Sequence, residues 1–177
     1  MAEKSLIKNL KKGQEEAYIF LLEQYGNRLL STCYLILKDK GEAEDVVQET
    51  FIRVFKNIHS FKGKSGLYTW IYSIALNLSR DKLRKKHDNL SLEEDWVGAS
   101  DVEYQVEKNF DRDLLRIELF KMNVIYREVL VLFYFEELSI KEISKLLDEK
   151  EGTIKSKLSR GRNMLKESLL KGGQLNG

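Results

Sequence analysis

The stretch SIKEISKLLDEKEGTIKSKLSRGR, residues 139–162, indicates the fold of the C-terminal part of this chain. Ser139 and Glu142 have the spacing of a capping box, which predicts a short helix that runs to Leu147. The polar residues 148–150 supply a turn, and a second, basic helix follows directly. A short helix, a tight turn and a basic helix are typical of a helix-turn-helix, and the alternative is a plain helical hairpin.

The second of these helices has an apolar side and a polar, basic side. Its apolar side recurs at helical spacing at Ile154, Leu158, Gly161, Leu165 and Leu169. Five polar positions lie mostly on the other faces, namely Thr153, Lys155, Ser156, Ser159 and Arg160. Residues 150–171 carry seven basic and two acidic side chains, a net charge of +5. We therefore predict that the polar side contacts the base edges and phosphates of DNA.

Three further amphipathic patterns precede this motif in the N-terminal part of the chain. They predict helices over residues 15–37, 42–56 and 67–78. In the second pattern, the stripe that should face the core consists of Ala43, Val46, Val47, Thr50, Phe51, Val54, Phe55 and Ile58. The absence of proline also favours helices joined by short turns. We predict that these helices pack as one small domain over residues 1–86.

An acidic segment separates the two helical parts. Residues 88–107 contain seven acidic residues and no Lys or Arg, a net charge of −7. The apolar residues there keep no helical spacing, so we predict an acidic linker over residues 87–109, with a solvated spacer as the simplest interpretation. Helical patterns over 110–122 and 124–135 lead into the helix-turn-helix and complete a second domain, residues 110–177. The predicted fold class is therefore all-α, with two small helical domains joined by the linker.

The composition excludes several classes of protein. The 177 residues are 42% hydrophobic and 33% charged, which is typical of a folded chain. No apolar run reaches the ~18 residues of a membrane span, and no signal peptide is visible, which predicts a cytoplasmic protein without membrane insertion. Cys33 is the single cysteine, which fits a reducing compartment, and with only His59 and His87 no zinc-binding spacing exists. No phosphate loop, nucleophile motif or metal cluster is present, so we expect no enzyme, no cofactor and no small-molecule substrate.

Three groups of polar or aromatic residues are candidates for recognition. The first is a compact patch on the 42–56 helix that suits a basic protein partner, made of Glu44, Asp45, Gln48, Glu49 and Arg53. The second is the segment 61–72, where a Gly/Ser/Lys loop leads into an aromatic helix start that could stack unpaired bases, although Trp70 fits better in the core. The third group shares one helix face within reach of nucleic acid and consists of Asn77, Arg80 and Arg84.

Several motifs resemble the extracytoplasmic-function group of bacterial sigma factors. Region 2 of that family is similar to residues 42–51 (EAEDVVQETF), 69–77 (TWIYSIALN) and 81–84 (DKLR). Region 4 is similar to residues 126–132 (YREVLVL), 138–143 (LSIKEI) and 151–162 (EGTIKSKLSRGR). The resemblance covers both predicted domains in the family's order and leaves only the linker unmatched.

The resemblance implies an all-helical factor that binds core RNA polymerase and directs initiation at promoters. Region 2 would dock on the β′ clamp helices through Asp45, Gln48 and Glu49. It would also melt the −10 element, with loop 60–67 capturing a flipped base, and the positions for this are Phe61, Lys62, Lys64, Tyr68, Thr69, Asn77, Arg80 and Arg84. Region 4 would pack on the β flap and read the −35 element through Thr153, Lys155, Ser156, Ser159 and Arg160. The family's linker threads toward the active centre and RNA exit path, and many members are held inactive by an anti-sigma factor.

The chain departs from the family pattern at three positions. The family often has a Leu-Pro pair before its Tyr-Arg motif, where this chain has Met122 and Asn123. Ser159 is small where some relatives carry larger side chains.

Two other functions stay open on the residues alone. The main alternative is a free-standing helix-turn-helix regulator, with residues 1–86 as a sensor or dimerisation domain. It predicts tight binding to duplex DNA without polymerase, but it leaves the acidic patch at Asp45 and the aromatic loop unexplained. A helical adaptor protein leaves both basic helices unexplained.

Overall fold

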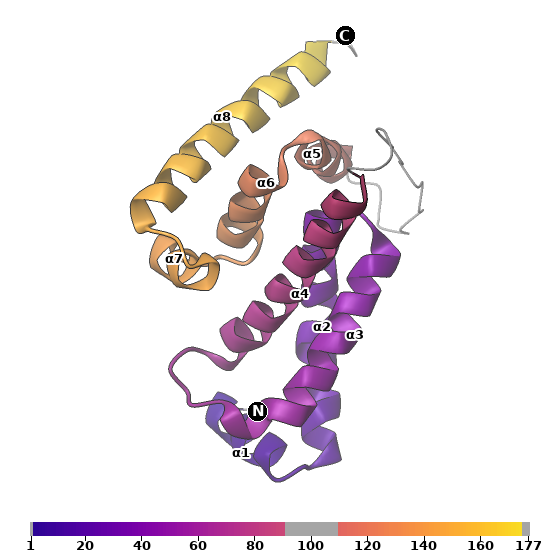
Figure 1. The fold of residues 1–177 in the computed structure, drawn as a ribbon, viewed down its shortest axis with the longest axis vertical. Helices are drawn as coiled ribbons and strands as arrows, with labels where there is room; N and C mark the ends of the chain where they lie inside the picture. Colours follow the sequence, from indigo (N-terminus) through magenta and orange to yellow (C-terminus); the bar gives the residue numbers. More distant parts are fainter. Residues whose placement is uncertain (1, 91–109, 175–177) are drawn as a thin grey trace. The chain divides into compact units, whose positions relative to one another are not determined.

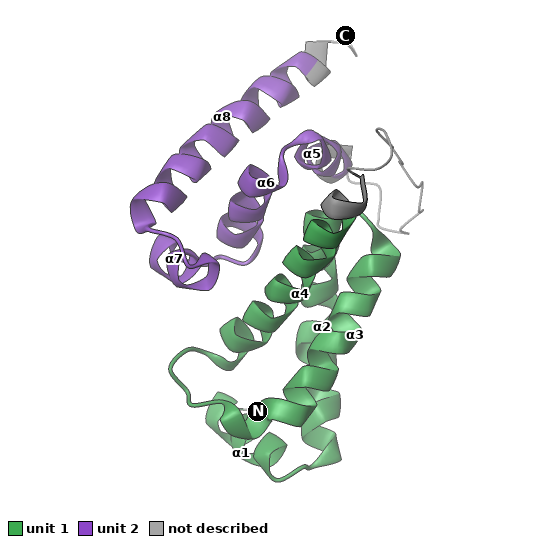
Figure 2. Ribbon diagram, in the orientation of Figure 1, with its two compact units in different colours: residues 1–100 green, residues 101–177 purple. Residues whose placement is uncertain are grey.

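The structure is a computed structural model that describes residues 2–90 and 110–174, with side chains over 2–86 and 113–171. Within these ranges the chain is helical and has no strand (Figure 1). It divides into two compact units, residues 1–100 and 101–177 (Figure 2). The prediction of an all-α fold with two helical domains is confirmed. Among the described helices, none is long and apolar enough to cross a membrane.

The first unit is a helical bundle. Its described elements are α1 (Glu3–Lys11), α2 (Glu15–Leu37), α3 (Lys40–Asn57), the 3-10 turn η1 (Ile58–Ser60) and α4 (Leu67–Leu90). Helices α2, α3 and α4 pack side by side, and α1 packs against α2 and η1 (Figure 1). The core that they enclose is apolar, with Leu21, Leu29, Ile36, Ala43, Val46, Val54, Ile71, Tyr72 and Leu76 all buried.

The end of α4 differs from the predicted domain boundary. The helix runs to Leu90, beyond the helix predicted over 67–78 and past the predicted domain end at residue 86, because no glycine or proline interrupts the chain there. The rest of the predicted acidic linker, residues 91–109, lies outside the described residues.

A tight turn between α2 and α3 sets the direction of α3. Lys38 ends α2 in the left-handed region, with a φ of 63°, and its N–H donates to the carbonyl of Tyr34 at 2.8 Å. Asp39 then caps α3, because its Oδ1 accepts the N–H of Glu42 at 2.9 Å. This turn fixes which side of α3 faces the bundle and which side remains exposed.

The second unit contains the helix-turn-helix. Its described elements are α5 (Phe110–Lys121), α6 (Val124–Leu130), the π-helical turn η2 (Val131–Phe135), α7 (Ile140–Leu147) and α8 (Glu151–Gln174). The capping box predicted at the start of α7 is confirmed, with hydrogen bonds in both directions between Ser139 and Glu142. Asn123 caps the start of α6, because its side-chain oxygen accepts a hydrogen bond from the N–H of Ile125 at 3.1 Å. An asparagine cap thus begins this helix at the position where the family often has proline.

Gly161 allows α6 and α8 to approach each other closely. A Cβ at this position would lie 3.3 Å from Leu130 Cγ and 3.5 Å from Tyr126 Cβ. We therefore expect Gly161→Val to lower the free energy of unfolding by about 1–3 kcal/mol, because the added methyl groups overpack this contact. Urea unfolding followed by circular dichroism measures the change. Gly152→Val is the matched control, since nothing lies within 4 Å of a Cβ at Gly152, and an equal loss in both variants would contradict the explanation.

Candidate functional site

The predicted acidic patch on α3 forms one wall of a groove between α3 and α4. Asp45, Gln48 and Glu49, which we call the docking patch, line it together, with Lys82 and Asp81 of α4 on the opposite wall. The Asp45 side chain is 70% exposed and accepts a hydrogen bond from Lys82 Nζ at 3.1 Å. Glu49 pairs with Arg53 on the same helix at 2.8 Å. The structure thus brings the three predicted residues onto one accessible surface.

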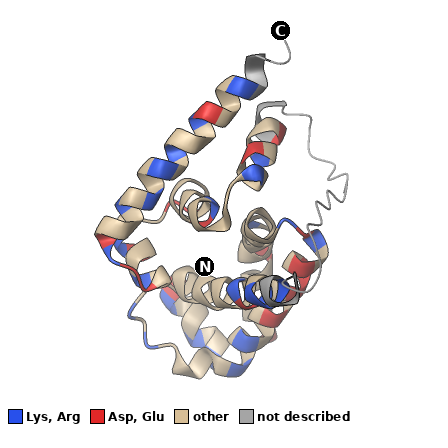
Figure 3. Cartoon of the chain, turned by 45° about the horizontal axis from the view of Figure 1, so that its top comes forward, with Lys and Arg blue, Asp and Glu red and all other residues tan. Residues whose placement is uncertain are grey.

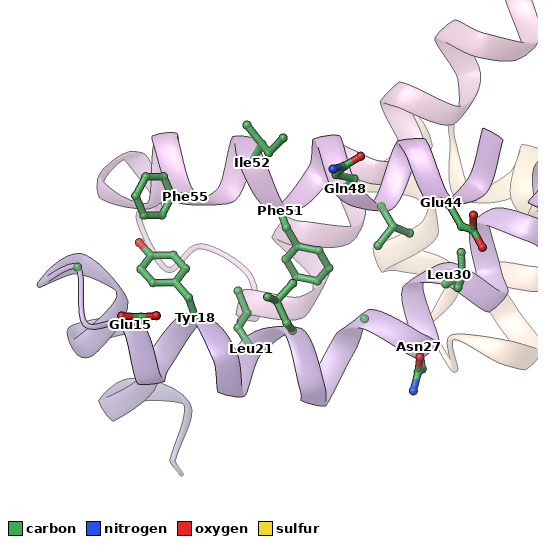
Figure 4. A pocket seen from close by; sticks show the side chains of 14 residues that line it. Glu15, Tyr18, Leu21, Asn27, Leu30, Glu44, Gln48, Phe51, Ile52 and Phe55 are labelled. Atoms are coloured by element: carbon green, nitrogen blue, oxygen red, sulfur yellow. The ribbon is translucent and has the colours of Figure 1, made fainter. Parts of the chain in front are cut away.

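An apolar hollow of about 680 Å³ lies on the other side of Gln48, between α2 and α3. Figure 4 shows Phe51, Ile52 and Phe55 of α3 above it and residues of α2 below it. Phe55 is 61% exposed and contacts the ring of Tyr18, with 5.0 Å between centroids. The prediction that Phe55 faces the core is therefore wrong. The apolar side of α3 is wider than the part that α2 and α4 cover, so Ile52 and Phe55 at its edge remain exposed.

The loop between η1 and α4 corrects the prediction for Phe61. Its side chain is only 5% exposed and packs on Trp70, with 5.2 Å between ring centroids, so in this conformation it is a core residue that cannot stack on a base. Lys62 and Lys64 are exposed as predicted. Gly63 has a φ of 67°, a backbone conformation that favours glycine. The part of the loop that is available to a nucleotide is therefore 62–66.

Tyr68 belongs to an aromatic and cationic cluster that the sequence did not reveal. Its ring lies 4.9 Å from that of Tyr25 and 6.0 Å from that of Tyr72, and the Arg28 guanidinium lies 4.9 Å from its centroid. Burial and the nearby Glu3 carboxylate raise the pKa of Tyr25, so its phenol stays neutral at physiological pH. The cluster holds Tyr68 half-buried at the start of α4, beside the loop.

The predicted face on α4 extends along the helix away from this loop. Asn77 and Arg84 are exposed, and Arg80 is half-buried. Arg84 makes a 3.1 Å ion pair with Asp81, which is weak because both side chains are largely in solvent. Thr69 is half-buried beside Gly66, so it lies at the loop end of this surface rather than with the arginines.

Helix α8 separates its two predicted faces cleanly. Ile154, Leu158 and Gly161 are buried. All five residues of the predicted polar face are exposed, namely Thr153, Lys155, Ser156, Ser159 and Arg160. Lys and Arg recur along the length of the helix (Figure 3). The helix therefore presents these five side chains to solvent, whereas Leu165 and Leu169 of the predicted apolar side are half-buried.

Two further contacts orient α8. Glu149, in the turn, accepts hydrogen bonds from Lys157 Nζ at 2.6 Å on both carboxylate oxygens, which ties the turn to the helix. Thr153, Ser156 and Arg160 also border a groove with Ile125 and Tyr126 of α6. Sequence reasoning did not distinguish Lys157 from the other basic residues of the helix. The acidic Glu149, eight positions earlier, was the feature of the sequence that could have indicated this ion pair.

Comparison with known families matches both units. The Sigma-70 region 2 family matches residues 21–88, and the Sigma-70 region 4 family matches residues 119–165. The ECF RNA polymerase sigma factor SigW of Bacillus subtilis is 34% identical over 182 residues, covering 96% of this chain and 97% of the relative. The ECF RNA polymerase sigma-E factor of Haemophilus influenzae is 28% identical over 184 residues, covering 96% of each chain.

Solved structures agree with this assignment. The sigma factor RpoE, solved in complex with the anti-sigma factor NepR from Bartonella quintana, is 25% identical, with a TM-score of 0.70 over 87% of this chain and 96% of that one. CnrH, solved with the cytosolic domain of CnrY, has a TM-score of 0.67 over 97% of this chain and 99% of that one, and at 20% identity this supports the fold. Together with the similarity to SigW, which extends over almost the whole chain, these matches show that the chain belongs to the ECF group of sigma-70 RNA polymerase sigma factors.

Proposed function

We propose that this chain binds core RNA polymerase and directs initiation at specific promoters by reading their −35 and −10 elements and opening the −10 region. The observation that carries the proposal is the division of α8 into a buried apolar face and an exposed polar face, in a chain similar to ECF sigma factors over almost its whole length. We assign −10 opening and polymerase docking to residues 1–86 and −35 reading to residues 110–177. The chain would act in the cytoplasm, where promoter DNA and polymerase meet.

The docking patch is the surface that we propose for core polymerase, on its β′ clamp helices. Asp45 is exposed, Glu49 is half-buried, and their ion pairs with Lys82 and Arg53 lie at the surface. Such pairs contribute about 0–1 kcal/mol each, so basic residues of a partner can replace Lys82 and Arg53 at little cost. The hollow beside Gln48 adds exposed apolar area, with Phe51 and Phe55 available for burial in the same interface.

The exposed loop residues and the α4 face form the surface that we propose for the −10 element. Glycines in loop 62–66 allow the backbone to approach a nucleotide, and Lys62 and Lys64 neutralise nearby phosphates. Asn77 and Arg84 supply further polar contacts along α4. Since Phe61 is buried, the aromatic contribution at the loop falls to the half-buried Tyr68.

The exposed face of α8 is the surface that we propose for the −35 element, and Arg160 is its strongest candidate for reading a base. If Arg160 pairs with a guanine, Arg160→Ala should cost about 1–3 kcal/mol at one −35 position and relax the preference there. If Lys155 is mainly a phosphate contact, Lys155→Ala should weaken binding evenly across sequences and reduce the salt slope by about 1. Promoter selection from a randomised −35 library measures both effects.

Lys166→Ala is the matched control for these substitutions. It removes the same charge from α8 six residues beyond Arg160, where Lys166 is exposed. We expect its sequence preferences to match those of the wild type. Identical selection profiles for Arg160→Ala and the wild type would exclude base reading by Arg160.

A protein inhibitor is the second partner that we propose. The similar sigma factor RpoE was solved in complex with the anti-sigma factor NepR, which supports a partner of this kind for the present chain. The apolar hollow between α2 and α3 is an accessible surface that such an inhibitor could share with polymerase.

In vitro transcription with purified core polymerase tests the proposed function. Promoter-specific initiation should appear only when this chain is added. The rival function, a free-standing helix-turn-helix regulator, instead predicts tight binding to duplex DNA in the absence of polymerase. Tight binding to the promoter without polymerase, together with no stimulation of initiation, would favour that rival.

A further inference from the structure

Two side chains of α1 reach the loop that precedes α4, one at each end. The Lys11 ammonium donates a hydrogen bond to the carbonyl of Phe61 at 3.0 Å. The N–H of Leu67 donates to Glu3 Oε1 at 3.1 Å. Both contacts join residues that lie more than 45 positions apart in the sequence. Helix α1 thus contacts the first residue of the loop and the first residue after it, and it leaves 62–66 exposed.

Glu3 also supplies what the start of α4 lacks. The first N–H groups of a helix have no partner within the helix, and a capping side chain usually satisfies one of them. Gly66, directly before α4, has no side chain. The Glu3 carboxylate accepts the N–H of Leu67, and it places a negative charge at the positive end of the helix. The capping group of α4 therefore comes from a distant element, α1.

The helix that makes these contacts is itself firmly anchored. Leu6 and Leu10 of α1 are 1% and 0% exposed. The Tyr18 hydroxyl of α2 donates to the carbonyl of Leu10 at 3.0 Å. At the other end of the Lys11 contact, Phe61 is buried against Trp70. A rigid helix is thus joined to the fixed end points of an otherwise exposed loop.

We propose that Glu3 and Lys11 are positioning residues for promoter opening, because they hold loop 62–66 in the shape that accepts a base leaving the DNA stack. The inference rests on the proposed function of that loop. Fixing both ends removes loop conformations before DNA arrives, so less conformational entropy is lost when the base is captured. Neither side chain needs to contact DNA for this effect.

The test compares holoenzymes with altered and unaltered α1 contacts. The double variant Glu3→Ala, Lys11→Met removes both hydrogen bonds, and Lys12→Met, Glu16→Ala makes the same charge changes at exposed neighbouring positions. The rate of duplex opening is followed by permanganate reactivity of unpaired −10 thymines. We expect opening to be about tenfold slower in the first variant and unchanged in the second. Core binding and transcription from a template with a mismatched, pre-opened −10 region should change by less than about twofold in both.

Conservative substitutions separate positioning from general damage to the fold. Glu3→Gln and Lys11→Arg retain an acceptor and a donor, so together they should recover most of the opening rate. If Glu3→Ala lowers the unfolding temperature, the single variant Lys11→Met carries the same test, since Glu3 still caps α4 in that variant. Wild-type opening rates in the double variant would overturn the inference. So would equal slowing in the control variant, or a loss that persists in full on the pre-opened template.

Failure of the inference about Glu3 and Lys11 can be distinguished from failure of the proposed function of loop 62–66. Replacing residues 62–66 tests that function directly. If the replacement slows opening but the α1 variant does not, only the inference about Glu3 and Lys11 is wrong. If the replacement leaves opening intact, the proposed loop function fails first, and the inference fails with it.

Discussion

The double variant Asp45→Arg, Glu49→Arg should stay folded and bind core polymerase at least about 30-fold more weakly than the wild type. The change reverses two charges on the docking patch, so a basic partner surface meets like charges, which typically costs about 2–5 kcal/mol at a close interface. Folding should survive, because both side chains are at the surface and the core residues of α3 are untouched. Equilibrium binding of labelled chain to core enzyme, with circular dichroism of the free chain, measures both results.

The matched control places the same two charge reversals elsewhere on the first unit. Glu16→Arg with Glu23→Arg alters two exposed acids of α2, outside both the docking patch and the hollow. Its core affinity should stay close to that of the wild type, so the net charge of the chain alone cannot explain the loss. If the Asp45 and Glu49 variant also binds with unchanged affinity, polymerase docks on another surface.

Local sequence rules predict the bounds of α2 and the start of α7 well. The pattern over residues 15–37 matches the bounds of α2, Glu15–Leu37. The spacing of Ser139 and Glu142 predicted the start of α7, because a capping box is formed by residues three positions apart. Such features depend on neighbouring residues only, and the rest of the fold can change them little.

Helix α1 could not be predicted in the same way. It is nine residues long, and isolated helices of that length are marginal in water. Its only buried side chains are Leu6 and Leu10, and their burial depends on contacts with other elements. The hydrogen bond that Glu3 accepts and the one that Lys11 donates join positions far apart in the chain, so no local spacing predicts them.

The candidate site shows the same limit at its aromatic residues. The periodicity predicts Phe55 in the core, but it is exposed, and the family resemblance predicts Phe61 at the nucleic-acid surface, but it is buried. Helical periodicity predicts that a helix has an apolar face, but it does not predict how much of that face the neighbouring helices cover. In a loop there is no periodicity at all, so the burial of Phe61 depends on Trp70, which only the folded bundle brings next to it.

Replacing residues 62–66 with an unrelated sequence of equal length should reduce opening of the −10 region by roughly 100-fold. Capturing a base outside the stack costs a few kcal/mol, and the loop is proposed to supply contacts that offset this. Phe61 stays in place in this variant, because its removal would damage the core. Core binding and −35 recognition should remain nearly intact, since the docking patch and α8 are unchanged. Permanganate reactivity of unpaired thymines on the duplex promoter is the measurement.

A second variant and a second template separate the parts of this effect. Lys62→Ala with Lys64→Ala keeps Gly63, whose φ of 67° favours glycine, and so removes only the charges. It should open the promoter at a rate between those of the wild type and the full replacement. A template that is already mismatched at −10 should recover much of the lost transcription if melting is the main defect, and recovery stays partial because base capture also holds the open strand. Wild-type reactivity in the full replacement would show that the loop only connects η1 to α4.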